Sequence, residues 1–241
     1  MPQNVPAYEF NDNAKKVRAV VFQFWCDNGY PPNLFAVHQA TGLSRQEIVD
    51  AYNDLDLGIM CTVDVDSQNC YLLKAPPFSS YPTPVQVYID GRFHSYAGCA
   101  MESVAISKMP PFAGKELRLE SSCACCFEPI SLVSRDFEML SKKPESVMVH
   151  VSTSPRDWNK TNMVSMCDSM SFVMDARHAQ QYEKQIGRLG VLFTIDQAKL
   201  FVTETANNRL WRYDWAPARM LPGPIIEGIR AMGVDVSNWG A

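Results

Sequence analysis

The residues best suited to do chemistry are a cysteine and a carboxylate one helical turn apart. In the stretch SYAGCAMESV, Cys99 precedes Glu102 by three positions within a small and apolar run. If a helix begins near Gly98, the thiol lies at its amino end and the carboxylate lies over the same face. A helix amino terminus favours the thiolate form of cysteine, so the pair predicts a nucleophilic sulfur beside a proton donor. The alternative is a cysteine that serves only as a small buried hydrophobe.

Cysteines are frequent along the whole chain, at positions 26, 61, 70, 99, 123, 125, 126 and 167. The first ten residues lack the basic and apolar regions of a signal peptide, so we expect a cytoplasmic protein with reduced thiols. Reduced cysteines serve packing, metal binding or catalysis rather than a disulfide framework.

Three of these cysteines, Cys123, Cys125 and Cys126, share the segment ESSCACCFEP, which we place in a turn between two strands. Structural zinc sites usually add a second cysteine pair or two closely spaced histidines. Here no second pair follows and the four histidines are scattered, so packed thiols at a strand turn are favoured over zinc.

Length and composition bound the class of protein. The 241 residues, 46% of them hydrophobic, can bury the core of one large domain or two small ones. No run approaches the roughly 18 apolar residues of a membrane helix, so no membrane association is expected. The net charge of −4 gives no indication of a nucleic-acid partner.

The first 80 residues are expected to form a helical, winged-helix-like domain. Apolar spacing predicts a helix over 11–29 that ends at Gly29, and a short helix follows at 33–40. Ser44 and Glu47 form a capping box for a third helix, and two strand-like runs then flank the polar turn DSQN. The shape suggests DNA binding, but five basic and nine acidic residues give this domain a charge of 5 − 9 = −4. A phosphate-binding surface needs the opposite sign.

A Pro- and Ser-rich segment, 74–84, reads as the link to a second domain over 81–241. Runs typical of strands occur at 85–90, 93–96, 115–122, 129–134, 147–153 and 191–195, with helices expected near Gly98, over 176–187 and from 196 onward. Asp175 is a candidate cap for the second of these helices. Mostly antiparallel strands with helices to one side predict an α+β catalytic domain, with a carboxy-terminal extension from about residue 206.

The thiol-bearing motifs taken together resemble the organomercurial (alkylmercury) lyases. The resemblance covers about residues 12–205, through PPFSSYPTPVQVYIDG, AGCAMES, SSCACCFEPISL, SMCDSMSFV and LGVLFTIDQA in that order. It implies a winged-helix-like domain joined to an α+β catalytic domain, in which two cysteines and one carboxylate break a carbon–mercury bond without a cofactor. The catalytic cysteines then fall on Cys99 and Cys167, and a further cysteine with a structural role falls on Cys123.

The sequence departs from the family pattern at three positions. The family aspartate is Glu102 here, one methylene longer, and both are carboxylates of similar reference pKa, about 3.9 and 4.3. The tryptophan that usually precedes the first cysteine is Gly98, which opens the pocket. A frequent cysteine after the second catalytic one is Asp168, a candidate extra carboxylate near the metal.

The resemblance predicts protonolytic cleavage of an organomercurial such as methylmercury. Two soft thiolates capture the mercury, and Glu102 delivers a proton to carbon. The product Hg(II) then passes to small thiols or to a mercuric reductase. Two alternatives stay open: a thiol protein that binds or senses soft metals without turnover, and an enzyme of this fold that acts on another carbon–heteroatom bond.

Overall fold

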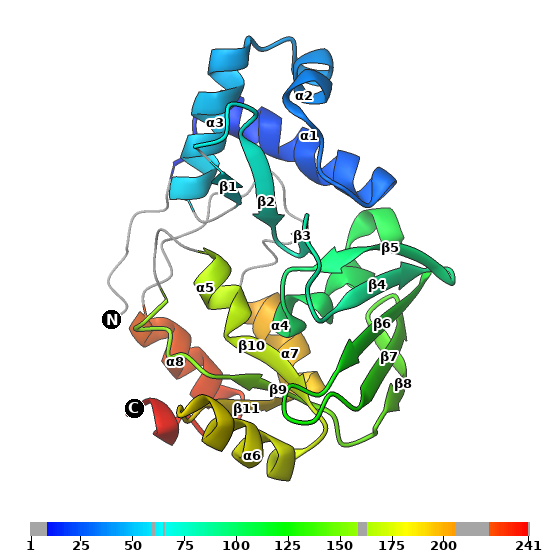
Figure 1. The fold of residues 1–241 in the computed structure, drawn as a ribbon, viewed down its shortest axis with the longest axis vertical. Coiled ribbons are helices and arrows are strands. Elements are labelled where there is room, and N and C mark those ends of the chain that lie inside the picture. The colour runs from blue at the N-terminus through cyan, green and yellow to red at the C-terminus, as the bar shows by residue number, and fades with distance from the viewer. Residues whose placement is uncertain (1–8, 59–60, 65, 159–162, 206–221, 241) are drawn as a thin grey trace.

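Helices and antiparallel sheets make up the fold, as Figure 1 shows for a computed structural model of the chain. The structure describes residues 9–58, 61–64, 66–158, 163–205 and 222–240. The amino-terminal helices lie at one end of the molecule in Figure 1, where the first two strands lie beside them, and the remaining strands lie below. Among the described residues, no helix combines the length and the apolar character needed to cross a bilayer.

Three amino-terminal helices begin within one residue of the predicted positions: α1 (Asp12–Asn28), α2 (Leu34–Thr41) and α3 (Arg45–Leu57). Helix α1 ends because Gly29 adopts a left-handed conformation, with φ of 79°, and its N–H bonds back to the Trp25 carbonyl. The capping box at Ser44 and Glu47 is confirmed, since each side chain bonds the backbone N–H of the other residue.

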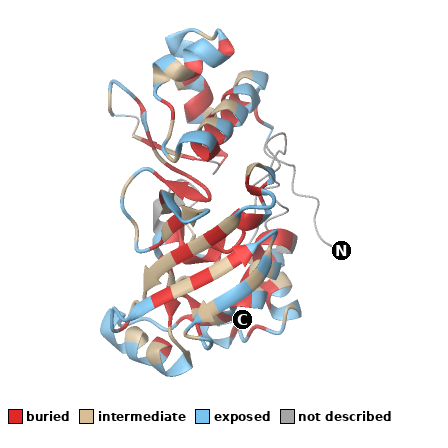
Figure 2. Cartoon of the chain, turned by 90° about the vertical axis from the view of Figure 1, so that its right-hand side faces the viewer, coloured by how far each residue is buried: buried red, intermediate tan, exposed pale blue. Residues whose placement is uncertain are grey.

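One antiparallel sheet of eight strands joins the amino-terminal unit to the rest of the chain. Its strands lie in the order β1-β2-β3-β5-β4-β6-β7-β8. Their bounds are β1 (Thr62–Asp64), β2 (Tyr71–Ala75), β3 (Phe78–Ser79), β4 (Gln86–Ile89), β5 (Arg92–Ala97), β6 (Glu116–Ser122), β7 (Pro129–Arg135) and β8 (Glu138–Lys143). Figure 2 shows the bands of alternating burial that a sheet with one inward face produces.

The segment predicted as a link between domains contributes a strand of its own. Within it, β3 pairs with β2 on one side and with β5 on the other. The sequence pattern did not predict this two-residue strand, because prolines precede and follow it and proline is rare inside sheets. The helices and the β1–β2 hairpin of the predicted winged-helix unit are present, but β2 continues into the large sheet. The winged-helix assignment and the domain boundary at residue 80 stay predictions.

A second sheet of three antiparallel strands has β9 (Met148–Val151) between β10 (Met170–Val173) and β11 (Val191–Thr194). Helix α6 (Ala176–Ile186) packs against β10, and α7 (Ile195–Leu200) packs against β9 and β11. Asp175 caps α6 as predicted, because its carboxylate accepts the His178 N–H.

Short helical elements complete the described fold. They are α4 (Ala100–Ser103), η1 (Ile106–Lys108), η2 (Pro110–Phe112), α5 (Met163–Asp168), η3 (Phe201–Thr205), α8 (Pro222–Ala231) and η4 (Ser237–Trp239). Residues 206–221 of the predicted carboxy-terminal extension lie outside the described residues. Helix α8 packs on η3 and buries Ile225, Ile226 and Ile229, so this part of the extension is packed against the rest of the fold.

The amino-terminal helices are tied to the large sheet by α1. Trp25 stacks on Phe78 of β3 with ring centroids 5.7 Å apart. On β5, His94 donates a hydrogen bond from Nε2 to the Cys26 carbonyl at 3.0 Å. Position 29 must be glycine for this approach, because a Cβ there would lie 2.0 Å from the His94 carbonyl oxygen.

Candidate active site

Cys99 stands at the start of a helix, as the sequence predicts. Strand β5 ends at Ala97, and Gly98 turns the chain while its N–H bonds the Pro77 carbonyl at 2.6 Å. Cys99 is the cap residue of α4, with extended backbone, and its Sγ accepts the Glu102 N–H at 3.4 Å. The thiol therefore caps the first turn of this short helix.

The Glu102 carboxylate lies between two thiols. Its Oε2 atom is 3.7 Å from Cys99 Sγ and 3.8 Å from Cys167 Sγ. The three ligand atoms all lie within 4.8 Å of one another, and all three residues are buried. The structure therefore brings together the two distant cysteines and the carboxylate that the resemblance implies, and their catalytic roles stay a prediction.

Cys167 reaches this site from α5, just before β10 of the small sheet. A hydrogen bond with Cys99, burial and the nearby Glu102 carboxylate raise the pKa of the Cys167 thiol well above its usual range, while the positive charge of Lys74 acts against the rise. The sulfur environment extends to Met170, whose Sδ lies 3.8 Å from Cys99 Sγ. The site is therefore rich in soft donors, and a cation stands beside it.

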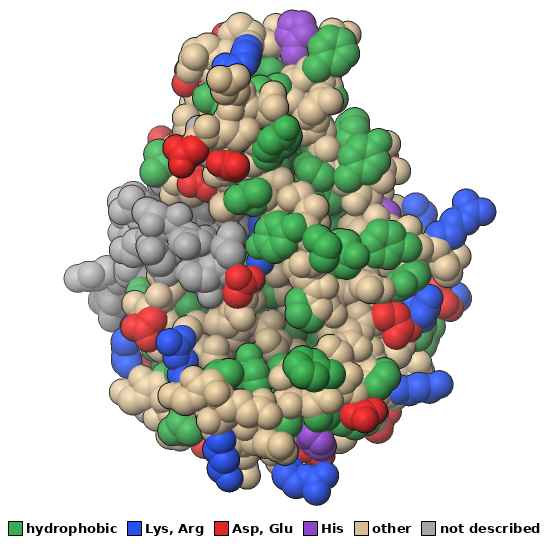
Figure 3. Space-filling model, in the orientation of Figure 1, with side chains coloured by type: hydrophobic (Ala, Val, Ile, Leu, Met, Phe, Trp, Pro, Cys, Tyr) green, Lys and Arg blue, Asp and Glu red, His purple; other side chains and the backbone are tan. Residues whose placement is uncertain are grey.

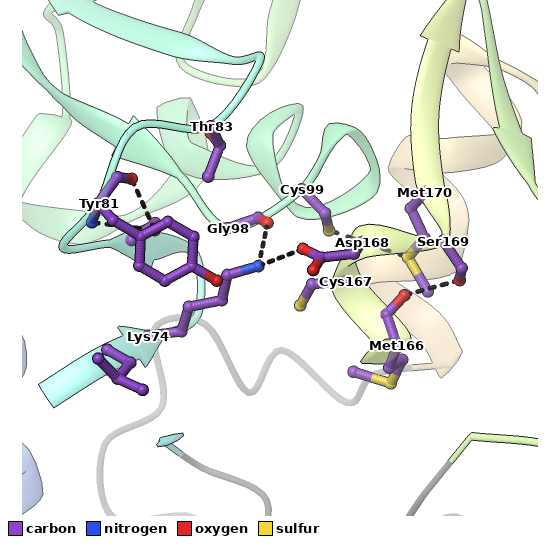
Figure 4. A network of polar contacts seen from close by, with 12 residues as sticks. Lys74, Tyr81, Thr83, Gly98, Cys99, Met166, Cys167, Asp168, Ser169 and Met170 are labelled. Carbon is purple, nitrogen blue, oxygen red and sulfur yellow. Dashed lines mark hydrogen bonds and ion pairs between the residues drawn. The ribbon is translucent and has the colours of Figure 1, made fainter. Parts of the chain in front are cut away.

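That cation is the ammonium of Lys74, which Figure 4 shows reaching from β2 toward the two cysteine segments. Its Nζ donates to the Gly98 carbonyl at 3.2 Å and to Asp168 Oδ1 at 2.7 Å. The Lys74 side chain is fully buried, whereas that of Asp168 is 58% exposed. Burial lowers the pKa of Lys74, but the Cys167 thiol and the Asp168 carboxylate outweigh it and hold that pKa above its ordinary value.

A cavity of about 460 Å³ opens onto the two sulfurs. Aromatic and small residues line it beside Cys99, Cys167 and Asp168, among them Tyr81, Gly98, Phe127, Phe172 and Tyr182. Figure 3 shows hydrophobic side chains gathered across the middle of the molecule, below the amino-terminal helices. A Cβ at Gly98 would lie 3.4 Å from Glu102 Oε2, so the small residue before the first cysteine leaves room for the longer carboxylate.

The three-cysteine turn lies beside the cavity, but its three cysteines are not among the residues that line the cavity. Ala124 and Phe127 line the cavity, and the Ala124 N–H bonds the Phe172 carbonyl at 2.9 Å. Cys123 is fully buried, as predicted, Cys125 is buried, and Cys126 is exposed with its Sγ 3.9 Å from Met174 Sδ. The structural role of Cys123 stays a prediction.

Comparison with known proteins decides the family. The model of the family described as "MerB: Alkylmercury lyase" matches residues 78–206, more than half of the chain. This chain belongs to the alkylmercury lyase family. A solved structure titled "Crystal structure of the mercury-bound form of MerB2" shares the fold, with a TM-score of 0.66 and 19% sequence identity. The match covers 86% of this chain and 94% of that one. Among curated proteins, the comparison found no match.

In this member of the alkylmercury lyase family, sequence reasoning missed Lys74 as part of the site. The residue lies before the segment that the family model matches, and its role depends on strand pairing that brings β2 beside β3. One signal was present: within the strand YLLKA, Lys74 and Leu72 fall on the same face by the period of two, so a lysine shares the buried face with a leucine.

Proposed function

We propose that this protein is an organomercurial lyase that cleaves the carbon–mercury bond of compounds such as methylmercury by protonolysis. Cys99 and Cys167 are the sulfur ligands, and Glu102 carries the proton. The observation that carries the proposal is the approach of two buried thiols to one carboxylate oxygen, within 4.8 Å, in a chain of the alkylmercury lyase family. The shared fold with a mercury-bound MerB2 structure supports the same conclusion.

Capture of the substrate follows from ligand softness. Soft thiolates are the protein ligands that hold soft metal ions best, so a thiolate at Cys99 binds the R–Hg⁺ cation. Two thiolate–metal bonds of about 2.3 Å each, as in zinc sites, match sulfurs that lie within 4.8 Å of each other. Cys167 can therefore add to the same mercury atom with little movement of either backbone.

Cleavage then requires one proton at carbon. Glu102 takes a proton from one thiol as its sulfur binds mercury, and the second thiol loses its proton to solvent. The second sulfur donates electron density to mercury and polarises the carbon–mercury bond toward carbon. Glu102 returns its proton to that carbon, the bonding electron pair goes with the carbon, and R–H leaves. Hg(II) remains on the two thiolates, so protons and charge balance.

Release of Hg(II) needs an acceptor softer or more concentrated than the two cysteines. We propose that low-molecular-weight thiols or a mercuric reductase serve this role outside the protein, and that the reaction itself uses no cofactor. The aromatic and small residues of the cavity leave space for a modest alkyl or aryl group beside the sulfurs.

The test is headspace gas chromatography after methylmercury and excess small thiol are added to the full-length protein. Catalytic methane release, absent in Cys99→Ser, is the expected result, because serine offers a hard and weakly acidic ligand. Stoichiometric binding of methylmercury without methane would instead identify a soft-metal binding protein, and no binding at all would point to another carbon–heteroatom substrate.

A further inference from the structure

We propose that Lys74 is a positioning residue that clamps the two thiol-bearing segments together, so that the amino-terminal hairpin completes the active site. Its ammonium bonds Gly98, the residue before Cys99, and Asp168, the residue after Cys167. One side chain therefore joins the chain neighbours of both sulfurs. The inference rests on the proposed function, since it assigns a role to Lys74 in presenting the two sulfurs to one mercury atom.

Strand pairing explains why a residue of the amino-terminal hairpin reaches the site. Lys74 pairs with Ser79 of β3, and Ser79 pairs with Tyr96 near the end of β5. Strand β5 runs directly into Gly98 and Cys99. The register therefore delivers the lysine to the point where the first catalytic segment begins.

The Lys74 ammonium lies in a buried polar environment. A buried ammonium is costly unless its donors are paired. Lys74 donates two hydrogen bonds, to the Gly98 carbonyl and to Asp168 Oδ1, and the Tyr81 side chain lies beside its ammonium. The Tyr81 ring also faces the ammonium, with its centroid 5.2 Å from Nζ, as Figure 4 shows.

The clamp has a direct consequence for mercury binding. Cys99 comes from the large-sheet side and Cys167 from the short helix that leads into the small sheet, so their separation depends on contacts between these parts. Without the lysine, we expect mercury to be held by one sulfur firmly and by the second poorly.

The first experiment compares Lys74→Met with Lys142→Met in the full-length protein. Lys142 lies on β8, pairs with Glu145 at 2.9 Å, and serves as a lysine–carboxylate control away from the cavity. Mercuric chloride is titrated against a competing small thiol while the mercury–thiolate absorbance is followed, and single-turnover methane release is measured alongside. We expect the competing thiol to remove mercury from Lys74→Met at about one tenth of the concentration that the parent requires. Methane release should be about 10²-fold slower, because small misplacements of reacting groups cost rates of this order.

A double-mutant cycle separates the clamp from independent roles of the two residues. If Lys74 and Asp168 act through one bond, Lys74→Met combined with Asp168→Ala is no worse than Lys74→Met alone. Additive losses, or a Lys74→Met protein that matches Lys142→Met in both assays, would overturn the inference.

Should Lys74→Met not fold, the comparison moves to the exposed partner: Asp168→Asn keeps an oxygen acceptor and should retain tight mercury binding, while Asp168→Ala should weaken it. The reverse order would also overturn the clamp. A parent protein that releases no methane refutes the lyase proposal, whereas the mercuric chloride titration still tests the clamp.

Discussion

The Glu102 carboxylate and the Cys167 thiol lie 3.8 Å apart although 65 residues separate them in the sequence. The same carboxylate oxygen lies 3.7 Å from Cys99 Sγ. A single oxygen atom is therefore within reach of both thiol protons, and it lies beside the place where both sulfurs would hold mercury. In the proposed mechanism, proton transfer and metal capture belong to different side chains, so substitution should separate the two functions.

Replacement of Glu102 by glutamine should separate capture from cleavage. Glu102→Gln keeps the size and polarity of the side chain but removes the transferable proton. Since capture depends on the sulfurs, the variant should still bind methylmercury stoichiometrically, while single-turnover methane release falls by about 10²–10⁴-fold. A variant that releases methane at the parent rate would make Glu102 a bystander, and Asp168 would be the next candidate for the donor.

Glu102→Asp tests whether the longer carboxylate is an adaptation to the space at Gly98. Aspartate is the residue that the family pattern carries, so the variant should keep measurable methane release. Its shorter side chain withdraws the oxygen from the two sulfurs, and we therefore expect a rate between those of the parent and of Glu102→Gln. The measurement is single-turnover release of the three proteins side by side. A rate as low as that of Glu102→Gln would show that the reach of the carboxylate is essential here.

Two thiols of the three-cysteine turn, those of Cys125 and Cys126, should be dispensable for turnover. Cys125 and Cys126 do not line the cavity, and burial raises the pKa of the Cys125 thiol, which disfavours its reactive form. The double variant Cys125→Ser, Cys126→Ser should release methane within a few-fold of the parent rate. Cys123 is fully buried and is left unchanged in this variant. A folded double variant without activity would move the metal site to this turn.

Much of the local structure could be predicted because its signals are local. Gly29 ends α1, Ser44 caps α3 and Asp175 caps α6 through bonds to residues a few positions away. Cys99 could be placed at a helix start for the same reason. Such signals depend only on side chains and on neighbouring backbone groups.

The unpredicted features depend on pairing between distant segments. Strand β10 lies in an apolar run whose periodicity does not distinguish a strand from a helix, and only its pairing with β9 defines it. The sequence places Lys74 only among the basic residues of the first 80, because its partners at Gly98 and Asp168 are 24 and 94 residues away. The meeting of Cys99 with Cys167 was predicted only through the family resemblance, since no local signal brings them together.

The amino-terminal unit should not bind DNA. Its acidic balance of 5 − 9 = −4 over residues 1–80 repels phosphate, and α1 is held against the large sheet through Trp25 and Phe78. Gel-shift titration at low salt exaggerates electrostatic binding, so the absence of a complex there is a stringent result. We expect none up to micromolar protein. Tight binding that weakens with added salt would contradict this and would revive a regulatory role.

The contact between α1 and the large sheet should weaken in acid because of His94. This half-buried histidine donates from Nε2 to the Cys26 carbonyl at 3.0 Å, and its Nδ1 lies 2.9 Å from the Ser95 hydroxyl. Burial lowers the pKa of His94 from its ordinary 6.5, and the positive charge of Lys115 acts in the same direction.

The sign of the pH effect follows from proton counting. Between the lowered native pKa and 6.5, the unfolded chain binds a proton at His94 that the native protein does not bind. The free energy of unfolding therefore falls as pH decreases below about 6.5, and the loss is complete once pH lies below the native pKa. Urea unfolding at pH 7.5 and pH 5.5 measures this. His94→Gln should lose less stability on acidification than the parent, because glutamine has no proton to gain. Equal pH dependence in the parent and in His94→Gln would assign acid sensitivity to other groups, with His150 first, since burial lowers its pKa as well.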